Sequence, residues 1–174
     1  MSVSHVASLI ALKEEMFSRT MQVAPLCPRD KLMWAPRPEA LTLGQVLRHM
    51  YRSELNRMRF LNGQIDIQEY YVLRHGEGEA RNLKATLGEV TDLDAELTGL
   101  KEAHTYSLQT LGGLSDEDLA RPTDWGGKKR TTLEFFLLVF EHDAQHRGQV
   151  ATYLRLLGVE RPAGRDWRGL VYGR

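Results

Sequence analysis

The sequence predicts an all-α fold, a four-helix bundle whose helices are joined by long crossover loops. Three observations support this. Apolar residues recur at steps of three and four in four long stretches, which is the period of a helix. Proline, Asn-Gly and Gly-Gly sequences separate those stretches. No segment shows a marked two-residue alternation of apolar and polar side chains, so no strand is expected.

The first half of the chain predicts two helices. The first is expected over residues 4–24, where Pro25 ends it, and a proline-rich connection follows over residues 25–41. The second starts at Thr42-Leu43-Gly44-Gln45, which has the form of a capping box, and ends at Asn62-Gly63. Residues 64–80 are polar and predict a surface loop with room for a short helix.

The second half predicts two more helices. The third is expected over residues 80–111 and ends at Gly112-Gly113. A short helical turn at Ser115 and a connection over residues 120–131 follow. A second capping box, Thr131-Thr132-Leu133-Glu134, starts the last helix, which ends near Gly158.

Length and composition restrict the classes of protein to which this chain can belong. With 174 residues the chain is expected to form one domain, residues 1–174, with its core over about 4–158 and a tail over 159–174. Lys+Arg and Asp+Glu both total 23, which argues against a nucleic-acid or membrane partner held by bulk charge. No stretch is apolar enough to span a bilayer, and no secretory signal is recognisable. Cys27 is the single cysteine; we interpret it as a loop thiol rather than a nucleophile, in a cytoplasmic protein.

Two histidines in the last helix interrupt an apolar stripe. His142 and His146 are four residues apart and therefore lie on one helical face. Buried neutral imidazoles need partners for their ring nitrogens, and one metal ion would take a lone pair from each. The alternative is two core histidines that hydrogen-bond to other helices. A metal also needs a third ligand, and His49, next to the apolar stripe of the second helix, is the best placed.

Three polar residues near these histidines are candidates for a catalytic role. They are Gln149, Tyr153 and Ser53.

Five further positions carry structural expectations. We expect His75 in solvent, and His104 at the edge of the core unless it assists the site as an acid or base. Trp34 either lines a pocket or caps the core. We expect Arg147 to form a salt bridge and Gly148 to permit close helix packing.

Three motifs together resemble those of the DinB/YfiT-like family of metal-dependent enzymes. They are Asp30-Lys31-Leu32-Met33-Trp34, the segment Thr42 to His49, and Glu141-His142-Asp143-Ala144-Gln145-His146-Arg147-Gly148-Gln149. The resemblance covers about residues 6–158. It implies an up-down-down-up bundle, often a homodimer, and one divalent metal held by His49, His142 and His146. Family members of known activity are thiol S-transferases that use bacillithiol or mycothiol, or related isomerases.

Two functions therefore compete. The first is a mononuclear metal enzyme, a thiol S-transferase or hydrolase that acts on a small molecule, with or without a low-molecular-weight thiol. The second is a non-catalytic metal-binding or stress-response bundle. Histidine ligands do not select among zinc, nickel, iron and manganese.

Two other metal enzymes are disfavoured. A zinc peptidase would need Glu where Asp143 stands between the histidines, and a di-iron bundle would need paired Glu-x-x-His motifs.

Overall fold

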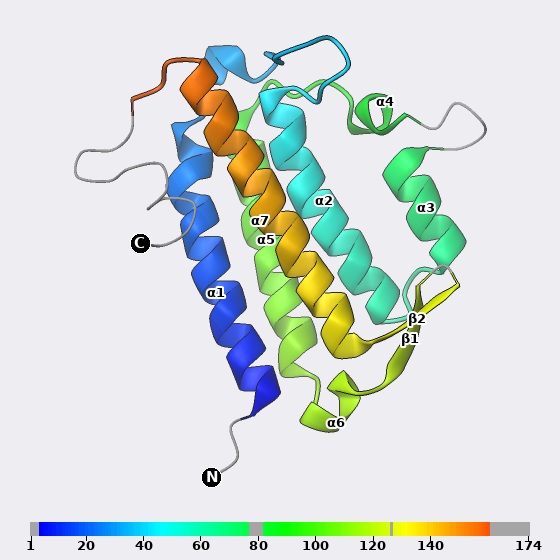
Figure 1. Cartoon of the computed structure of the whole chain (residues 1–174). Coiled ribbons are helices and arrows are strands. Elements are labelled where there is room, and N and C mark those ends of the chain that lie inside the picture. The colour runs from blue at the N-terminus through cyan, green and yellow to red at the C-terminus, as the bar shows by residue number, and fades with distance from the viewer. Residues whose placement is uncertain (1–3, 77–81, 126, 161–174) are drawn as a thin grey trace.

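The computed structural model describes residues 4–76, 82–125 and 127–160 of the chain. Four long helices form a bundle: α1 (His5–Val23), α2 (Leu43–Leu61), α5 (Leu93–Gly112) and α7 (Thr132–Leu156). In Figure 1 the chain ascends in α1, descends in α2 and α5, and ascends again in α7. Both α1 and α2 pack against α5 and α7. The all-α bundle and its up-down-down-up order are therefore confirmed.

The segment between α2 and α5 makes these two helices parallel. It contains α3 (Ile67–His75) and α4 (Leu83–Leu87), which return the chain to the end of the bundle where α2 began (Figure 1). The expectation of one helix over residues 80–111 is wrong. Gly88 has φ +66° and ends α4, and the Asp92 side chain then caps a new helix. The apolar period continued through this break because Leu87 and Val90 are buried on both sides of it.

A small hairpin contradicts the expectation of no strand. It pairs β1 (Pro122–Trp125) with β2 (Lys128–Thr131) after the short helix α6 (Asp116–Leu119). The turn is set locally, since Gly127 has φ +84° and its N–H donates to the Asp124 carboxylate at 2.8 Å. Strands of four residues are too short for a two-residue period to stand out in sequence.

The two helix starts predicted from capping boxes are confirmed. Thr42 and Gln45 form a reciprocal capping box at α2, and Thr131 and Glu134 form one at α7. α2 ends at the expected Asn62.

Two short 3₁₀ turns, Ala24–Leu26 and Arg29–Lys31, begin the predicted connection over residues 25–41. Trp34 packs edge-on against Tyr153 with 5.5 Å between ring centroids and joins the core cluster beside it, which favours its capping role. Cys27 is buried, and burial raises the pKa of its thiol to about 12. A thiol that stays protonated is a poor nucleophile, in line with the sequence interpretation.

Polar side chains divide the core into two apolar clusters. One cluster gathers Val23, Leu43, Val46, Leu47, Met50, Leu100, Val150 and Leu154, and the other gathers Val6, Leu9, Met16, Met58, Leu111, Phe135, Phe136 and Phe140. Between them Lys13 Nζ lies 2.6 Å from Glu54 Oε1 and 2.8 Å from Asp143 Oδ2, all three side chains being at most 8% exposed. We call these three residues the buried ion triad. Ser107 of α5 donates to Glu54, so all four long helices meet in this polar layer.

The buried ion triad was not predicted from the sequence, although the sequence contains a signal for it. Lys13 lies four residues after Leu9 and three before Met16, in register with the apolar stripe of α1. Glu54 lies midway between Met50 and Met58 of α2. Charges of opposite sign inside two apolar stripes indicate a buried pair, because neither could be buried alone.

Among the described helices none is both long and apolar enough to cross a bilayer.

Candidate metal centre

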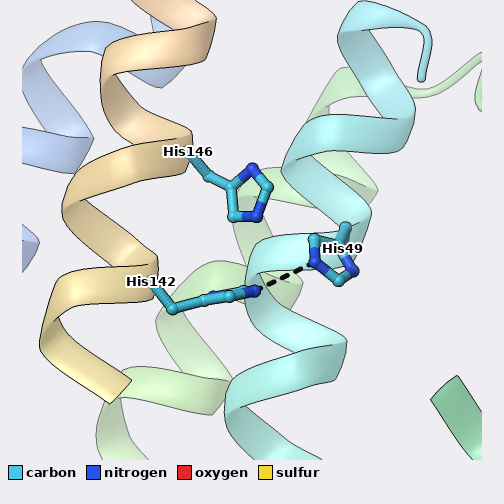
Figure 2. A group of neighbouring side chains, drawn as sticks. All are labelled: His49, His142 and His146. Carbon is cyan, nitrogen blue, oxygen red and sulfur yellow. Dashed lines mark hydrogen bonds between the residues drawn. The ribbon is translucent and has the colours of Figure 1, made fainter. Parts of the chain in front are cut away.

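Three imidazoles from two helices lie together inside the bundle. His49 projects from α2, and His142 and His146 project from one face of α7 toward it (Figure 2). The Nε2 atoms of His49 and His142 are 3.0 Å apart, and one ring nitrogen from each of the three residues lies within 4.8 Å of the others. His49 is buried, the side chain of His142 is 10% exposed, and His146 is half-buried. The three residues selected from the sequence are therefore brought together; their role as ligands stays a prediction.

The helices explain this convergence. Residues four apart on α7 share a face, so His142 and His146 stack toward the same neighbour. On α2, His49 is flanked by Val46 and Met50, which are buried in the core and hold the helix face against α7. Both helices are packed into the core of the bundle. The imidazoles are therefore held by rigid helices rather than by a loop.

The donor set fits a divalent metal. Two nitrogens on a tetrahedral ion with bonds of about 2.0–2.1 Å lie roughly 3.3 Å apart, close to the His49–His142 separation. Burial lowers the pKa of His142 to about 4, and the charge of Arg57 also lowers it, against the opposite effect of Asp143. His142 is therefore neutral near pH 7, as a ligand must be. Its Nδ1 has no hydrogen-bond partner among the described residues, and Asp143 Oδ1, at 3.9 Å, is too far to accept from it.

A chain of hydrogen bonds fixes the tautomer of His146. The Leu41 carbonyl can only accept, so Tyr153 donates its hydroxyl proton to it at 3.2 Å. Tyr153 then accepts from Gln149 Nε2 at 3.0 Å, which turns the Gln149 amide oxygen toward His146 Nδ1 at 2.8 Å. An amide oxygen only accepts, so Nδ1 carries the proton and Nε2 carries the lone pair. That nitrogen is the one available to a metal.

The Gln149→Leu variant is expected to bind zinc on the order of 10–100-fold more weakly than the wild type, because it loses the group that orients a ligand. Gln149→Glu keeps an acceptor oxygen at the same distance and should bind far more tightly than Gln149→Leu. Competition with a chromophoric chelator measures both affinities. Equal loss in the two variants would show that the acceptor at Nδ1 does not matter.

The hydrogen bonds of their side chains separate the three catalytic candidates into two groups. Gln149 and Tyr153 are engaged in the hydrogen-bond chain that orients His146, so their side chains hold this imidazole in place. Ser53 lies one turn after His49 in the wall of a small void, and its buried Oγ has no hydrogen-bond partner in the part of the chain described. Only Ser53 keeps an uncommitted hydroxyl.

The structure also tests the sequence-based expectations for residues outside the histidine cluster. His104 stacks on Phe17 of α1 with 3.9 Å between ring centroids, and burial lowers its pKa to about 4; this supports its place at the edge of the core. Arg147 is buried and its Nη1 donates to the Met16 carbonyl. The expectation that Gly148 permits close packing is wrong, because a Cβ there would meet open space. The side chain of His75 and the tail 161–174 lie outside the described residues.

A cavity of about 260 Å³ adjoins His142. Its lining comes from α2, the hairpin and α7: Arg57, Trp125, Arg130, Phe135, Leu138, Glu141, His142 and Gln145. A larger open groove of about 730 Å³ lies between α2 and α5, but none of the three histidines lines it. Of these two spaces, the smaller cavity is the one that adjoins the candidate metal centre.

The fold and the histidine cluster define a helical bundle with a candidate metal centre, and comparison with known proteins identifies the family. A model of the DinB family matches residues 1–166, and the chain belongs to that family. No match was found among curated proteins.

Solved structures share the fold. A DinB-like protein of Bacillus cereus ATCC 10987 is 20% identical, with a TM-score of 0.65 over 86% of this chain and 91% of its own. A DinB-like protein of Bacillus subtilis, YjoA, is 19% identical, with a TM-score of 0.63 over 91% and 98%. A conserved protein of Enterococcus faecalis is 12% identical, with a TM-score of 0.68 over 99% and 100%.

Proposed function

We propose that this protein is a mononuclear divalent-metal-dependent enzyme that acts on a small molecule, as a thiol S-transferase or a hydrolase. The observation that carries the proposal is the convergence of three imidazoles beside a cavity of about 260 Å³. Three protein ligands leave a position open for water or substrate, which is the arrangement typical of catalytic rather than structural sites.

The metal would supply Lewis acidity and lower the pKa of a water or thiol beside it. The residues of the chain do the rest. His49, His142 and His146 present lone pairs from rigid helices, and Gln149 keeps His146 in the required tautomer. His49 is 4% exposed and the side chain of His142 is 10% exposed, so little bulk water reaches them, which strengthens electrostatic interactions inside the site.

The position of Asp143 supports the choice of reaction class. In a zinc peptidase the acid between the two histidines acts as the base at the metal. Here the Asp143 carboxylate accepts from Lys13 in the buried ion triad, on the side of α7 that faces α1. It is therefore committed to the core and is poorly placed to serve as that base.

An assay of purified protein with low-molecular-weight thiols, thiol-reactive electrophiles and ester substrates tests the proposal. Protein loaded in turn with zinc, nickel, iron and manganese is expected to turn over at least one of these substrates, and His142→Ala is expected to lose the activity. Tight metal binding without turnover by any metal form would favour the non-catalytic bundle. The homodimer, the thiol cosubstrate and the absence of nucleic-acid and membrane partners stay predictions.

A further inference from the structure

Arg57 is a buried cation with no counter-ion in the part of the chain that the structure describes. It lies on α2 and is 8% exposed, yet among the described residues it forms no ion pair, and its buried Nη1 has no hydrogen-bond partner. Two other arginines in the bundle have partners. Arg48 bonds Glu96 and two backbone carbonyls, and Arg147 bonds the Met16 carbonyl. A buried guanidinium is costly without an acceptor, and the described residues supply none to this nitrogen, so an anion bound from outside would stabilise it.

The position of Arg57 indicates where that partner would lie. Arg57 lines the cavity beside His142, and Arg130 of β2 lines the same cavity from the hairpin. Neither arginine forms an ion pair with a described carboxylate, and Glu141, also in the lining, is exposed. Two guanidinium groups from different elements therefore face a space that a small molecule can enter.

The rest of the lining restricts the shape of the ligand. Trp125 and Phe135 line the cavity, with 5.0 Å between their ring centroids. Aromatic walls bind an apolar or aromatic body, whereas a planar guanidinium binds a carboxylate or phosphate through two parallel hydrogen bonds. A cavity of about 260 Å³ has room for only a small compound.

We propose that Arg57 binds the anionic group of the substrate, and that the substrate is a small organic carboxylate or phosphate with an apolar body. Arg57 holds the oxyanion, Trp125 and Phe135 hold the body, and the ligand extends from them toward His142. The assignment of this ligand as substrate rests on the proposed metal-dependent function. Binding of the anion to Arg57 can be measured without the metal.

The test is binding of benzoate, phenyl phosphate and the neutral benzamide to metal-free, full-length protein. Isothermal titration gives the affinities, and quenching of Trp125 fluorescence, absent in Trp125→Phe, reports the location. At least one of the two anions is expected to bind about 10–100-fold more tightly than benzamide, the range of a charge-assisted hydrogen bond. Comparing the anions distinguishes a carboxylate ligand from a phosphate ligand.

Variants separate charge from fold. Arg57→Gln is expected to lose the preference for the anion, and Arg57→Lys to keep part of it. Arg59→Gln is the matched control, because Arg59 is exposed on the same helix and lines the other groove. Arg57→Gln should unfold at a temperature no lower than the wild type, since it removes an unpaired buried charge.

The proposal would be overturned by any of three results: no preference for an anion over benzamide in the wild type, unchanged anion affinity in Arg57→Gln, or an equal loss in Arg59→Gln. If the anion binds through Arg57 but no metal form of the protein shows turnover, the anion site stands and the proposed enzyme function fails.

Discussion

Replacing Lys13 by methionine is expected to destabilise the protein by about 3–5 kcal/mol, the range for breaking a buried ion pair from one side. Lys13 Nζ lies 2.6 Å from Glu54 and 2.8 Å from Asp143, and its side chain is 3% exposed. Without the ammonium group, the carboxyl groups of Glu54 and Asp143 would lose the cation that pairs with both of them in the polar layer of the core. Urea denaturation at pH 7, followed by circular dichroism, measures the free energy of unfolding.

The size of this loss is expected to depend on pH. Burial by itself would raise the pKa of Asp143, but Lys13 outweighs it and holds that pKa at about 2, below its ordinary value of 3.8. In the wild type Asp143 therefore contributes stability above about pH 4, and this contribution is lost as the pH falls through 2. Burial and Asp143 raise the pKa of Glu54 against the effect of Lys13, so removing Lys13 raises it further. At acid pH the buried carboxylates of the variant become protonated, which removes the cost of burying their charge. The loss of unfolding free energy relative to the wild type should therefore be smaller at pH 4 than at pH 7.

Two controls make the Lys13 result specific. Arg19→Met removes a cation from the same helix, where Arg19 pairs with Glu15 at the surface, and should cost less than about 1 kcal/mol. Adding Glu54→Gln to Lys13→Met removes one of the two stranded charges and should recover part of the loss. A Lys13→Met variant within 1 kcal/mol of the wild type at pH 7 would mean that the buried ion triad contributes no net stability.

Removing a single histidine of the metal centre is expected to weaken metal binding on the order of 100-fold or more, beyond the loss for a residue that only orients a ligand. Each of the variants His49→Ala and His146→Ala keeps only two of the three imidazoles. Zinc takes four ligands, so two imidazoles bind it much more weakly than three. At 100 times its dissociation constant zinc should stabilise the wild type by about 2.7 kcal/mol, and this stabilisation should be lost in both variants.

Metal analysis of the purified proteins and thermal unfolding with and without zinc provide the measurements. His5→Ala is the matched control, because His5 is exposed at the start of α1 and should leave metal content and zinc stabilisation unchanged. Unchanged metal content in both His49→Ala and His146→Ala would exclude the three-histidine centre. The two core histidines would then be a structural pair.

Local patterns determined most of the bundle from sequence alone. The period of the apolar residues marked α1, α2 and α7, and capping boxes at Thr42 and Thr131 marked two helix starts within a residue. These features depend on neighbours a few positions apart, which a sequence displays directly. The same local logic failed at residues 80–92, where buried Leu87 and Val90 maintained the helical period across a turn at Gly88.

The sequence by itself also selected His142 and His146, because their spacing on one helix is a local property. Three further features were decided only by the tertiary structure. His49 faces the two histidines, Lys13 lies between Glu54 and Asp143, and Arg57 lies beside a cavity without an ion-pair partner among the described residues. Each of these depends on how helices distant in the chain rotate and slide against one another. Packing of the two apolar clusters sets that register, and no short-range pattern contains it.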